Sequence, residues 1–113
     1  MKLEDIAGEL GLTDFTPEVT GNREAEIDCG YASDLLSDVL AHAQPGALWV
    51  TVQTHRNVVS VAATKDLAAV LFTCGRKPDP ATVVEAEEQG VVLLATSLGT
   101  FEVAGKLWEA GLR

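Results

Sequence analysis

The stretch ALWVTVQTHRNVVSVAATKDLAAVLFT, residues 47–73, contains the pattern that decides the fold. Its first part, ALWVTV (47–52), is a short apolar run of the kind that forms a strand buried on both faces. A strongly apolar helix is predicted from about 56 to 68, and the run AVLFT (69–73) is short and apolar enough for a second inner strand. Strand, helix and strand in this order predict a parallel pair joined by a right-handed crossover.

Residues 1–29 predict one helix and two short strands. The apolar residues Leu3, Ile6, Ala7 and Leu10 have helical spacing. Gly11 follows them and can end this helix in the left-handed conformation. Residues 15–19 (FTPEV) and 25–29 (AEIDC) are predicted to be short strands, the first weakened by Pro17.

A second helix is predicted over residues 34–43, with Ser33 as its N-cap. Pro45 and Gly46 end it, directly before the strand at 47–52. The apolar residues predicted to form its inner face are Leu35, Leu36, Val39, Leu40 and Ala43.

The alternation continues after residue 73. Asp79 pairs a capping side chain with Pro80 at the first helical position, and this helix is predicted to stop at Gly90. A further buried strand is predicted at 91–96 (VVLLAT). The last helix ends near Gly111, and one stripe along it carries Phe101, Ala104, Leu107 and Trp108. The chain is therefore predicted to be a single α/β domain over 1–113, an open and largely parallel sheet flanked by helices.

Composition narrows the class of protein. Apolar residues make up 47% of the 113 residues and charged residues 22%, which is ordinary for a globular domain with its own core. The N-terminus has acidic residues where a signal peptide needs an apolar segment, and no run approaches the roughly 18 apolar residues of a membrane span. We therefore expect a soluble cytoplasmic protein.

Charge and cysteine content exclude other classes. Seventeen acidic residues against 8 Lys and Arg give a net charge of −9, a field that repels nucleic acids and anionic membranes, so we expect neither as a partner. A local basic pocket for one small anion remains compatible with that charge. Cys29 and Cys74 are too few for a disulfide framework or a cluster of four cysteines, and we expect free thiols.

Polar residues gather where the predicted strands end. In open parallel sheets, ligands bind beyond the carboxyl ends of the strands, where loops lead into helices. The four segments at these ends, CGYASD (29–34), QTHRN (53–57), CGRKPD (74–79) and TSLGT (96–100), are all rich in glycine, hydroxyls, amides or charges. The opposite junctions, such as AQPG (43–46), have the composition of plain turns. A ligand-binding edge is therefore predicted.

Each polar residue also has a simpler interpretation. Thr54 or Asn57 can serve only as a helix cap, and His55 as a surface residue tied to backbone. The Gly75-Arg76-Lys77 turn offers backbone N–H groups and two cations for a phosphate or carboxylate, or it is an exposed turn with solvated charges. Asp34 and Asp38 lie one helical turn apart and could act as paired acids. Alternatively, Asp34 complements a helix N-terminus and Asp38 faces solvent or bonds a loop.

Catalytic patterns are absent from the sequence. It has no G-x-x-x-x-G-K-[ST], G-x-S-x-G, H-E-x-x-H or C-x-x-C motif. A Cys74–His55 couple has no third group to orient it, and His42, His55 and the cysteines do not form a recognisable metal-ligand spacing. We therefore predict no catalytic residue, no metal and no cofactor.

Two segments resemble a known family, the DRTGG domain in its small stand-alone form. They are YASDLLSDVLAHAQPGALWVTVQTHRN (31–57) and LFTCGRKPD (71–79), and the likeness extends over nearly the whole chain. Related domains occur in long bacterial phosphotransacetylases and in pyrophosphatases with CBS domains. The N-terminal domain of HPr kinase/phosphorylase has a similar fold.

The motif that names the family places Asp-Arg after one strand and Thr-Gly-Gly after the next. His55-Arg56 and Thr73-Cys74-Gly75 take these positions here, with His in place of Asp and Cys in place of the first Gly. Roles that depend on that Asp or on two consecutive glycines therefore do not transfer.

The resemblance implies regulation rather than chemistry. It favours a non-enzymatic regulatory or sensory module whose polar edge binds a small anionic or nucleotide-like ligand, or a partner enzyme. The alternative is an assembly or dimerisation subunit of a larger enzyme complex, and a small enzyme ranks third. High apolar content and the role of the domain in larger enzymes favour a symmetric homodimer. The predicted ligand-binding residues are Ser33, Asp34, Asp38, Thr51, Gln53, Thr54, His55, Arg56, Asn57, Thr73, Gly75 and Arg76.

Overall fold

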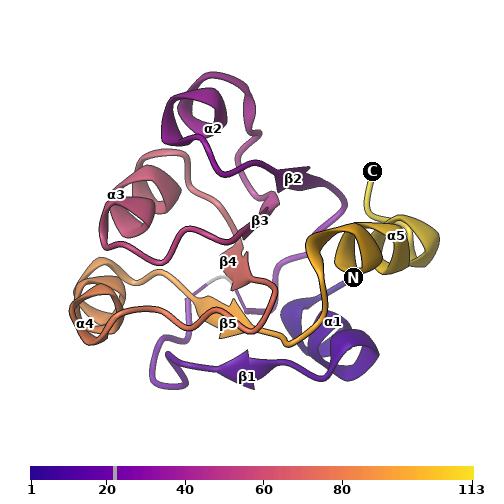
Figure 1. Cartoon of the computed structure of the whole chain (residues 1–113), viewed down its shortest axis with the longest axis horizontal. Coiled ribbons are helices and arrows are strands. Elements are labelled where there is room, and N and C mark those ends of the chain that lie inside the picture. Colours follow the sequence, from indigo (N-terminus) through magenta and orange to yellow (C-terminus); the bar gives the residue numbers. More distant parts are fainter. Residues whose placement is uncertain (22) are drawn as a thin grey trace.

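A computed structural model describes residues 1–21 and 23–113 of the chain. In this part of the chain, five strands form one sheet in the order β1-β5-β4-β3-β2 (Figure 1). The strands are β1 (Thr13–Asp14), β2 (Gly30–Ala32), β3 (Leu48–Thr51), β4 (Ala69–Phe72) and β5 (Leu93–Ala95). The helices are α1 (Leu3–Leu10), α2 (Leu36–His42), α3 (Asn57–Thr64), α4 (Pro80–Gln89) and α5 (Thr100–Ala110). The predicted α/β class is confirmed.

The order of the strands places the helices. The four strands from β2 to β5 are parallel neighbours in chain order, and β1 pairs antiparallel with β5 at the edge. Each crossover moves one strand in the same direction, so right-handed connections place α2, α3 and α4 on the same face. The helices α1 and α5 cover the other face (Figure 1). The predicted parallel pairing of 47–52, 69–73 and 91–95 is confirmed.

Alternation along the inner strands divides the core into two layers. Trp49 and Phe72 point toward the α2–α4 layer, whereas Leu48 and Leu71 point toward α1 and α5. All of β3, β4 and β5 is buried. Strands covered on both faces must be continuously apolar, which explains why the sequence pattern identified them.

The predicted strand at 15–19 is wrong. The edge strand β1 ends at Asp14, and the chain then turns around the buried Thr16, whose N–H donates to Asp14 Oδ1 (2.9 Å). The side-chain oxygen of Thr16 accepts a hydrogen bond from the backbone N–H of Leu93 (2.9 Å). A side chain therefore replaces the next ladder bond to β5, and Pro17 cannot donate one.

The predicted strand at 25–29 is also wrong, since β2 begins only at Gly30. The segment is anchored by the chain terminus: Ile27 N–H donates to the Met1 carbonyl (2.7 Å), and the Met1 ammonium group pairs with Glu26 (2.8 Å). Ile27 is buried under the sheet face that α1 and α5 cover. This partner lies far away in the sequence, so local periodicity could not reveal it.

The helix predicted over 34–43 is shorter than expected and begins later. Its N-cap is Leu35 rather than Ser33, whose Oγ instead accepts a hydrogen bond from the N–H of Leu35 (3.2 Å). The predicted inner face is partly wrong because Leu35 and Leu40 are 64% and 42% exposed. Val39 is the residue of α2 that is fully buried. The delayed start has a physical reason: the carboxylate of Asp34 bonds the end of β3 and does not enter the helix.

The helix predicted over 56–68 is observed as α3, and its end comes early. Asp66 adopts the left-handed conformation (φ 54°), and the chain then turns into β4. Capping by Thr54 or Asn57 is wrong: Arg56 occupies the N-cap without a side-chain capping bond, and the first N–H of the helix, that of Asn57, donates to His55 Nδ1.

The last two helices follow the sequence more closely. The helix α4 starts with Asp79 as N-cap and Pro80 at its first position, and Gly90 ends it with φ 73°. The caps predicted at Gly11 and Gly90 are confirmed. In α5, however, the buried residues are Val103 and Leu107, so Phe101 and Trp108 of the predicted stripe point outward. Among the described residues, no helix has the length and apolar character needed to cross a membrane.

Replacing Thr16 with Val should destabilise the fold by about 1–3 kcal/mol. Val has nearly the same shape, but it leaves the buried N–H of Leu93 without its acceptor, and an unpaired buried donor costs about that much. Urea unfolding followed by circular dichroism measures the loss.

Thr16→Ser is the matched control because it keeps the oxygen and removes only a methyl group. Amide exchange at Leu93 should be much faster in Thr16→Val than in Thr16→Ser. Equal exchange rates in the two variants would contradict the role assigned to this hydrogen bond.

Candidate functional site

The carboxyl ends of β2, β3, β4 and β5 lie at one edge of the sheet, because these strands are parallel. Backbone hydrogen bonds join the loops that follow these strands. The N–H of Thr73 donates to the Thr51 carbonyl (3.1 Å), and Gly75 N–H donates to the Thr96 carbonyl (3.0 Å). All the segments in which we predicted ligand-binding residues therefore lie on the same edge.

Asp34 organises the β2–β3 part of this edge. Its Oδ1 accepts hydrogen bonds from Thr51 Oγ1 and from the backbone N–H of Val52, both at 2.9 Å. The side-chain amide of Gln53 donates to the Asp34 carbonyl (3.2 Å), and the Thr51 oxygen accepts from Gln53 N–H (3.1 Å). Thr51 is only 1% exposed. These groups hold the two loops together, and Asp34 and Gln53 are the exposed residues among them.

Asp38 lies on α2, and its carboxylate forms hydrogen bonds with the nearby side chains of Tyr31 and His42. The Tyr31 hydroxyl donates to Asp38 Oδ2 (2.8 Å), and His42 Nδ1 lies 3.1 Å from Asp38 Oδ1. The bond from Tyr31, followed by those from Ser33 and His42, lowers the pKa of the Asp38 carboxyl. The same bond is the main reason why the pKa of Tyr31 is raised. Asp34 and Asp38 therefore serve separate networks and do not act as a pair of acids.

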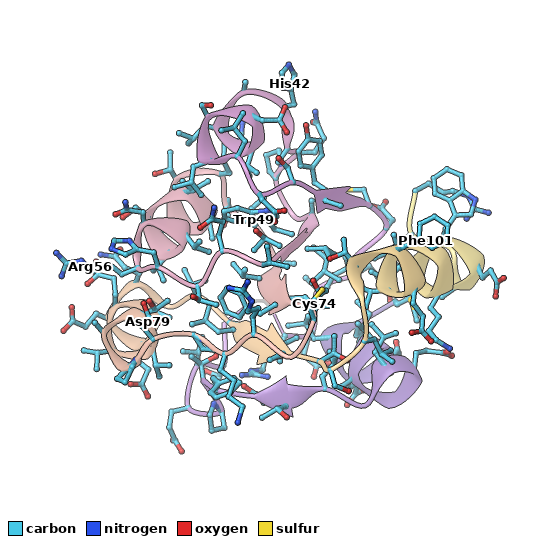
Figure 2. All side chains as sticks on the ribbon, in the orientation of Figure 1. His42, Trp49, Arg56, Cys74, Asp79 and Phe101 are labelled. Carbon is cyan, nitrogen blue, oxygen red and sulfur yellow. The ribbon has the colours of Figure 1, made fainter. Side chains whose placement is uncertain are left out.

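The loop after β3 is open to solvent at His55, Arg56 and Asn57. His55 Nδ1 accepts from the N–H of Asn57 (3.2 Å), while the Thr54 carbonyl accepts from the hydroxyl of Thr82 on α4 (2.7 Å). Arg56 lies at the outer side of α3 and α4, away from Cys74 at the middle of the edge (Figure 2). The structure thus separates this loop from the predicted residues after β4.

Hydrogen bonds to the loop after β5 and to the start of α5 hold the loop after β4. Thr73 is fully buried, and its hydroxyl lies 2.6 Å from that of Thr100 at the start of α5. Cys74 and Gly75 both adopt left-handed backbone, with φ 60° and 72°. A hydrogen bond from the backbone of Thr100 is the main cause that lowers the pKa of the exposed Cys74 thiol.

The prediction that the Gly75-Arg76-Lys77 turn offers free backbone N–H groups to an anion is wrong for Gly75 and Arg76. Their N–H groups donate to the carbonyls of Thr96 and Thr73, and the N–H of the preceding Cys74 donates to the carbonyl of Leu98. An anion at this turn would therefore be held mainly by side chains.

A cavity of about 220 Å³ lies beside this turn, between the ends of β1, β4 and β5. Sequence reasoning had placed Gly75 and Arg76 in the site, but it missed the residues that β1 and the β5–α5 loop contribute. Only the polar composition of residues 96–100 pointed in this direction. The residues that line the cavity include Thr13, Phe15, Gly75, Arg76, Lys77 and Ser97.

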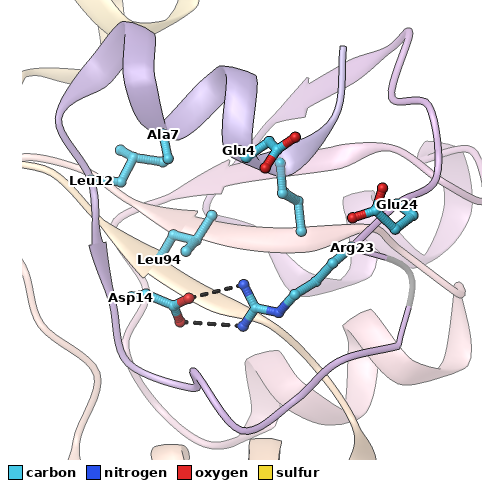
Figure 3. Close-up of a pocket in the computed structure, with 8 residues that line it drawn as sticks. Glu4, Ala7, Leu12, Asp14, Arg23, Glu24 and Leu94 are labelled. Atoms are coloured by element: carbon cyan, nitrogen blue, oxygen red, sulfur yellow. Dashed lines mark hydrogen bonds and ion pairs between the residues drawn. The ribbon is translucent and has the colours of Figure 1, made fainter.

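A larger cavity of about 280 Å³ lies between α1 and the edge of the sheet (Figure 3). Its arginine is already neutralised, because Arg23 Nη1 lies 2.9 Å from Asp14 Oδ2. Arg23 also donates to the carbonyls of Thr16 and Val19. Glu4 and Glu24 add further negative charge to the lining. The arginine of this cavity is therefore held by an ion pair, and the lining is acidic, so the cavity does not suit an anion.

A group of three or more metal-ligating side chains is not found in residues 1–21 and 23–113. The titratable residues of the edge are instead bonded in pairs or to backbone, as described for Asp34, Asp38 and His55. What remains available to a ligand is a set of exposed amides, hydroxyls and cations.

The fold and this edge define a small α/β module with a polar carboxyl edge. The family model described as "DRTGG domain" matches residues 19–110, and the chain belongs to that family. No curated protein sequence matches the chain.

A solved structure shares the fold: the CBS and DRTGG domains of the regulatory region of a Clostridium perfringens pyrophosphatase, complexed with the activator diadenosine tetraphosphate. The TM-score is 0.71 at 10% sequence identity. The similarity covers 94% of this chain and 45% of that one, so the chain spans less than half of the regulatory region.

The left-handed turn explains one feature of the family motif. Glycine adopts positive φ without the cost that a Cβ imposes, and the Thr-Gly-Gly of the motif would place glycine at both left-handed positions. In this chain Cys74 takes the first of them at φ 60°, so it tolerates strain that glycine would avoid.

Removing the Tyr31 hydroxyl should raise the pKa of Asp38 toward its ordinary value. A carboxyl whose pKa is lowered in the folded state contributes stability above its unfolded pKa, and that contribution is lost as the pH falls through the folded pKa. Tyr31→Phe should therefore cost stability at neutral pH, and the difference from wild type should shrink in acid. An NMR titration of the Asp38 carboxyl carbon and urea unfolding at several pH values measure both effects.

The control is Tyr31→Phe in an Asp38→Asn background, where the hydroxyl has no carboxylate to stabilise. A pH-dependent effect that is just as large in this background would disprove the link.

Proposed function

We propose that this DRTGG domain is a non-enzymatic cytoplasmic regulatory module that binds a small anionic or nucleotide-like ligand at the carboxyl edge of its sheet. The observation that carries the proposal is the pair of exposed cations, Arg76 and Lys77, beside a cavity at that edge. A regulatory region that contains a DRTGG domain binds a nucleotide activator in the similar pyrophosphatase structure, which supports the same class of ligand.

The chemistry of the edge supports binding without turnover. Phosphoryl transfer needs a metal site, a cradle for the phosphates and a positioned nucleophile or base. The hydroxyls of Thr51 and Thr73 are buried in structural hydrogen bonds, and Oδ1 of Asp34 accepts two hydrogen bonds from the end of β3. The cations that face solvent beside the cavity, Arg76 and Lys77, can hold an anion but do not activate water.

Nucleotide addition should raise the melting temperature, and the nucleotide should be recovered unchanged. At a concentration of ten times Kd, binding adds about 1.4 kcal/mol, which corresponds to roughly 5 °C for a domain of this size. Thermal shift with AMP, ATP and diadenosine tetraphosphate, followed by chromatography of the mixture, measures both. Steady ATP consumption by purified protein, abolished in Arg76→Ala, would instead establish an enzyme.

A second candidate function is assembly, as a homodimer or as a docking subunit of a partner enzyme. Its support is the outer face of α5, where Phe101 is 95% exposed and Trp108 is 59% exposed (Figure 2). Together with the exposed Ala104 they form one apolar stripe along the helix. A two-fold axis beside α5 would bury this stripe against its copy.

Phe101→Glu should convert a dimer into a monomer, because it would place two carboxylates in one apolar contact. Sedimentation velocity at high micromolar concentration gives the mass of each form. Val84→Glu is the control, since Val84 is a similarly exposed apolar residue (54%) on α4, which lies on the opposite face of the sheet. A wild-type protein that stays monomeric would count against self-association and leave docking to a partner enzyme as the assembly role.

A further inference from the structure

The helices diverge at one place along the carboxyl edge. The strands β2, β3 and β4 are each followed by a helix on the same face, α2, α3 and α4, so the loops after them turn the same way (Figure 1). After β5 the chain turns to the other face and forms α5. Neighbouring loops that leave in opposite directions open a crevice between their strands, and in open α/β sheets ligands bind in such a crevice. The 220 Å³ cavity lies beside this point, and its lining combines the turn after β4, the end of β5 and the β1 side of the sheet.

The charge of this crevice is opposite to that of the chain. The protein has 17 acidic residues and 8 Lys and Arg, yet Arg76 and Lys77 both line the crevice and the described residues that line it include no carboxylate. Within residues 1–21 and 23–113, neither cation takes part in an ion pair, whereas Arg23 in the other cavity does. Two unneutralised cations at one cavity of an acidic protein point to an anion.

The donors that are available suit a phosphate group. The guanidinium of Arg76 can bond two phosphate oxygens at once, and the Lys77 ammonium group adds a compact charge. The hydroxyls of Thr13 and Ser97 also line the crevice and make no hydrogen bond within the described part of the chain. Phe15 contributes an apolar wall on the β1 side, which suits a small organic group attached to the phosphate.

Size restricts the ligand further. Pockets for drug-sized molecules hold about 300–1,000 Å³, and this crevice holds about 220 Å³. It can enclose a phosphate group with a small organic part, but a dinucleotide would extend well beyond it.

We propose that the crevice at the ends of β1, β4 and β5 is a binding site for a compact phosphate monoester, with Arg76 and Lys77 as the residues that hold its phosphate group. This assignment rests on the proposed function, that the carboxyl edge binds a small anion. It narrows that function to one place on the edge and excludes the loop at 53–57 from the phosphate site.

The test is a titration of the whole chain with inorganic phosphate and with phenyl phosphate, followed by calorimetry and by amide NMR spectra. We expect the largest shifts at Gly75, Lys77 and Ser97, tighter binding of phenyl phosphate than of inorganic phosphate, and affinity that falls as NaCl is raised. Arg76→Ala and Lys77→Ala should each weaken binding about tenfold, the loss typical of a charge-assisted hydrogen bond.

Arg56→Ala is the matched control: it removes an equally exposed arginine from the same edge, outside the crevice, and should change the affinity less than twofold. Arg76→Gln repeats the charge removal with a side chain of similar length, and circular dichroism verifies that each variant is folded.

Different failures separate the two proposals. Binding that is weakened by Arg56→Ala and insensitive to Arg76→Ala and Lys77→Ala would place the ligand on the 53–57 loop, which overturns the crevice site and keeps the regulatory module. If a nucleotide binds but neither inorganic phosphate nor phenyl phosphate does, the crevice site is again overturned and the regulatory module is kept. If neither these probes nor AMP, ATP or diadenosine tetraphosphate binds, both proposals fail.

Discussion

The parallel pairing of β3 with β4, at the centre of a sheet covered on both faces, is the constraint on which the rest of the structure depends. Residues 48–51 and 69–72 are all buried, so every side chain of both strands must pack against a helix layer. Parallel neighbours require a crossover, and its right-handed sense assigns α3 to one face. Repeating this step from β2 to β5 places three helices on that face. The opposite face is left to α1 and α5.

This arrangement also sorts the polar groups of the carboxyl edge by depth. The hydroxyls nearest the sheet at this edge, those of Thr51 and Thr73, are buried, and they form hydrogen bonds with Asp34 and Thr100. Unpaired buried polar groups are costly, so these residues stabilise the edge. The exposed cations Arg76 and Lys77 lie beyond these hydroxyls, and in the described part of the chain their side chains do not bond the strand ends. Burial therefore distinguishes the stabilising hydroxyls from the exposed cations proposed to bind a ligand, although Thr73 and Arg76 are close neighbours in the sequence.

The edge is also asymmetric along its length. At the β2–β3 end, Asp34 and Gln53 close the loops onto each other. At the β4–β5 end, the two loops lead to opposite faces. The backbone of the turn after β4 is bonded to the loop after β5, and Arg76 and Lys77 of this turn line the cavity. The two ends have similar polar composition, but the second one places two adjacent cations, Arg76 and Lys77, at one cavity.

The sequence by itself determined the α/β class, the inner strands and the helices between them, because buried parallel strands must be continuously apolar and glycines at 11 and 90 mark helix ends. It also located the polar edge and two residues of the crevice, Gly75 and Arg76. Only the tertiary structure decided the place of the edge strands, the start of α2 and the face that each helix covers. Those features depend on bonds between distant residues, such as Thr16 with Leu93, and on the turn of the chain to the other face after β5. Local periodicity carries no information about either, since both arise only when the whole sheet is assembled.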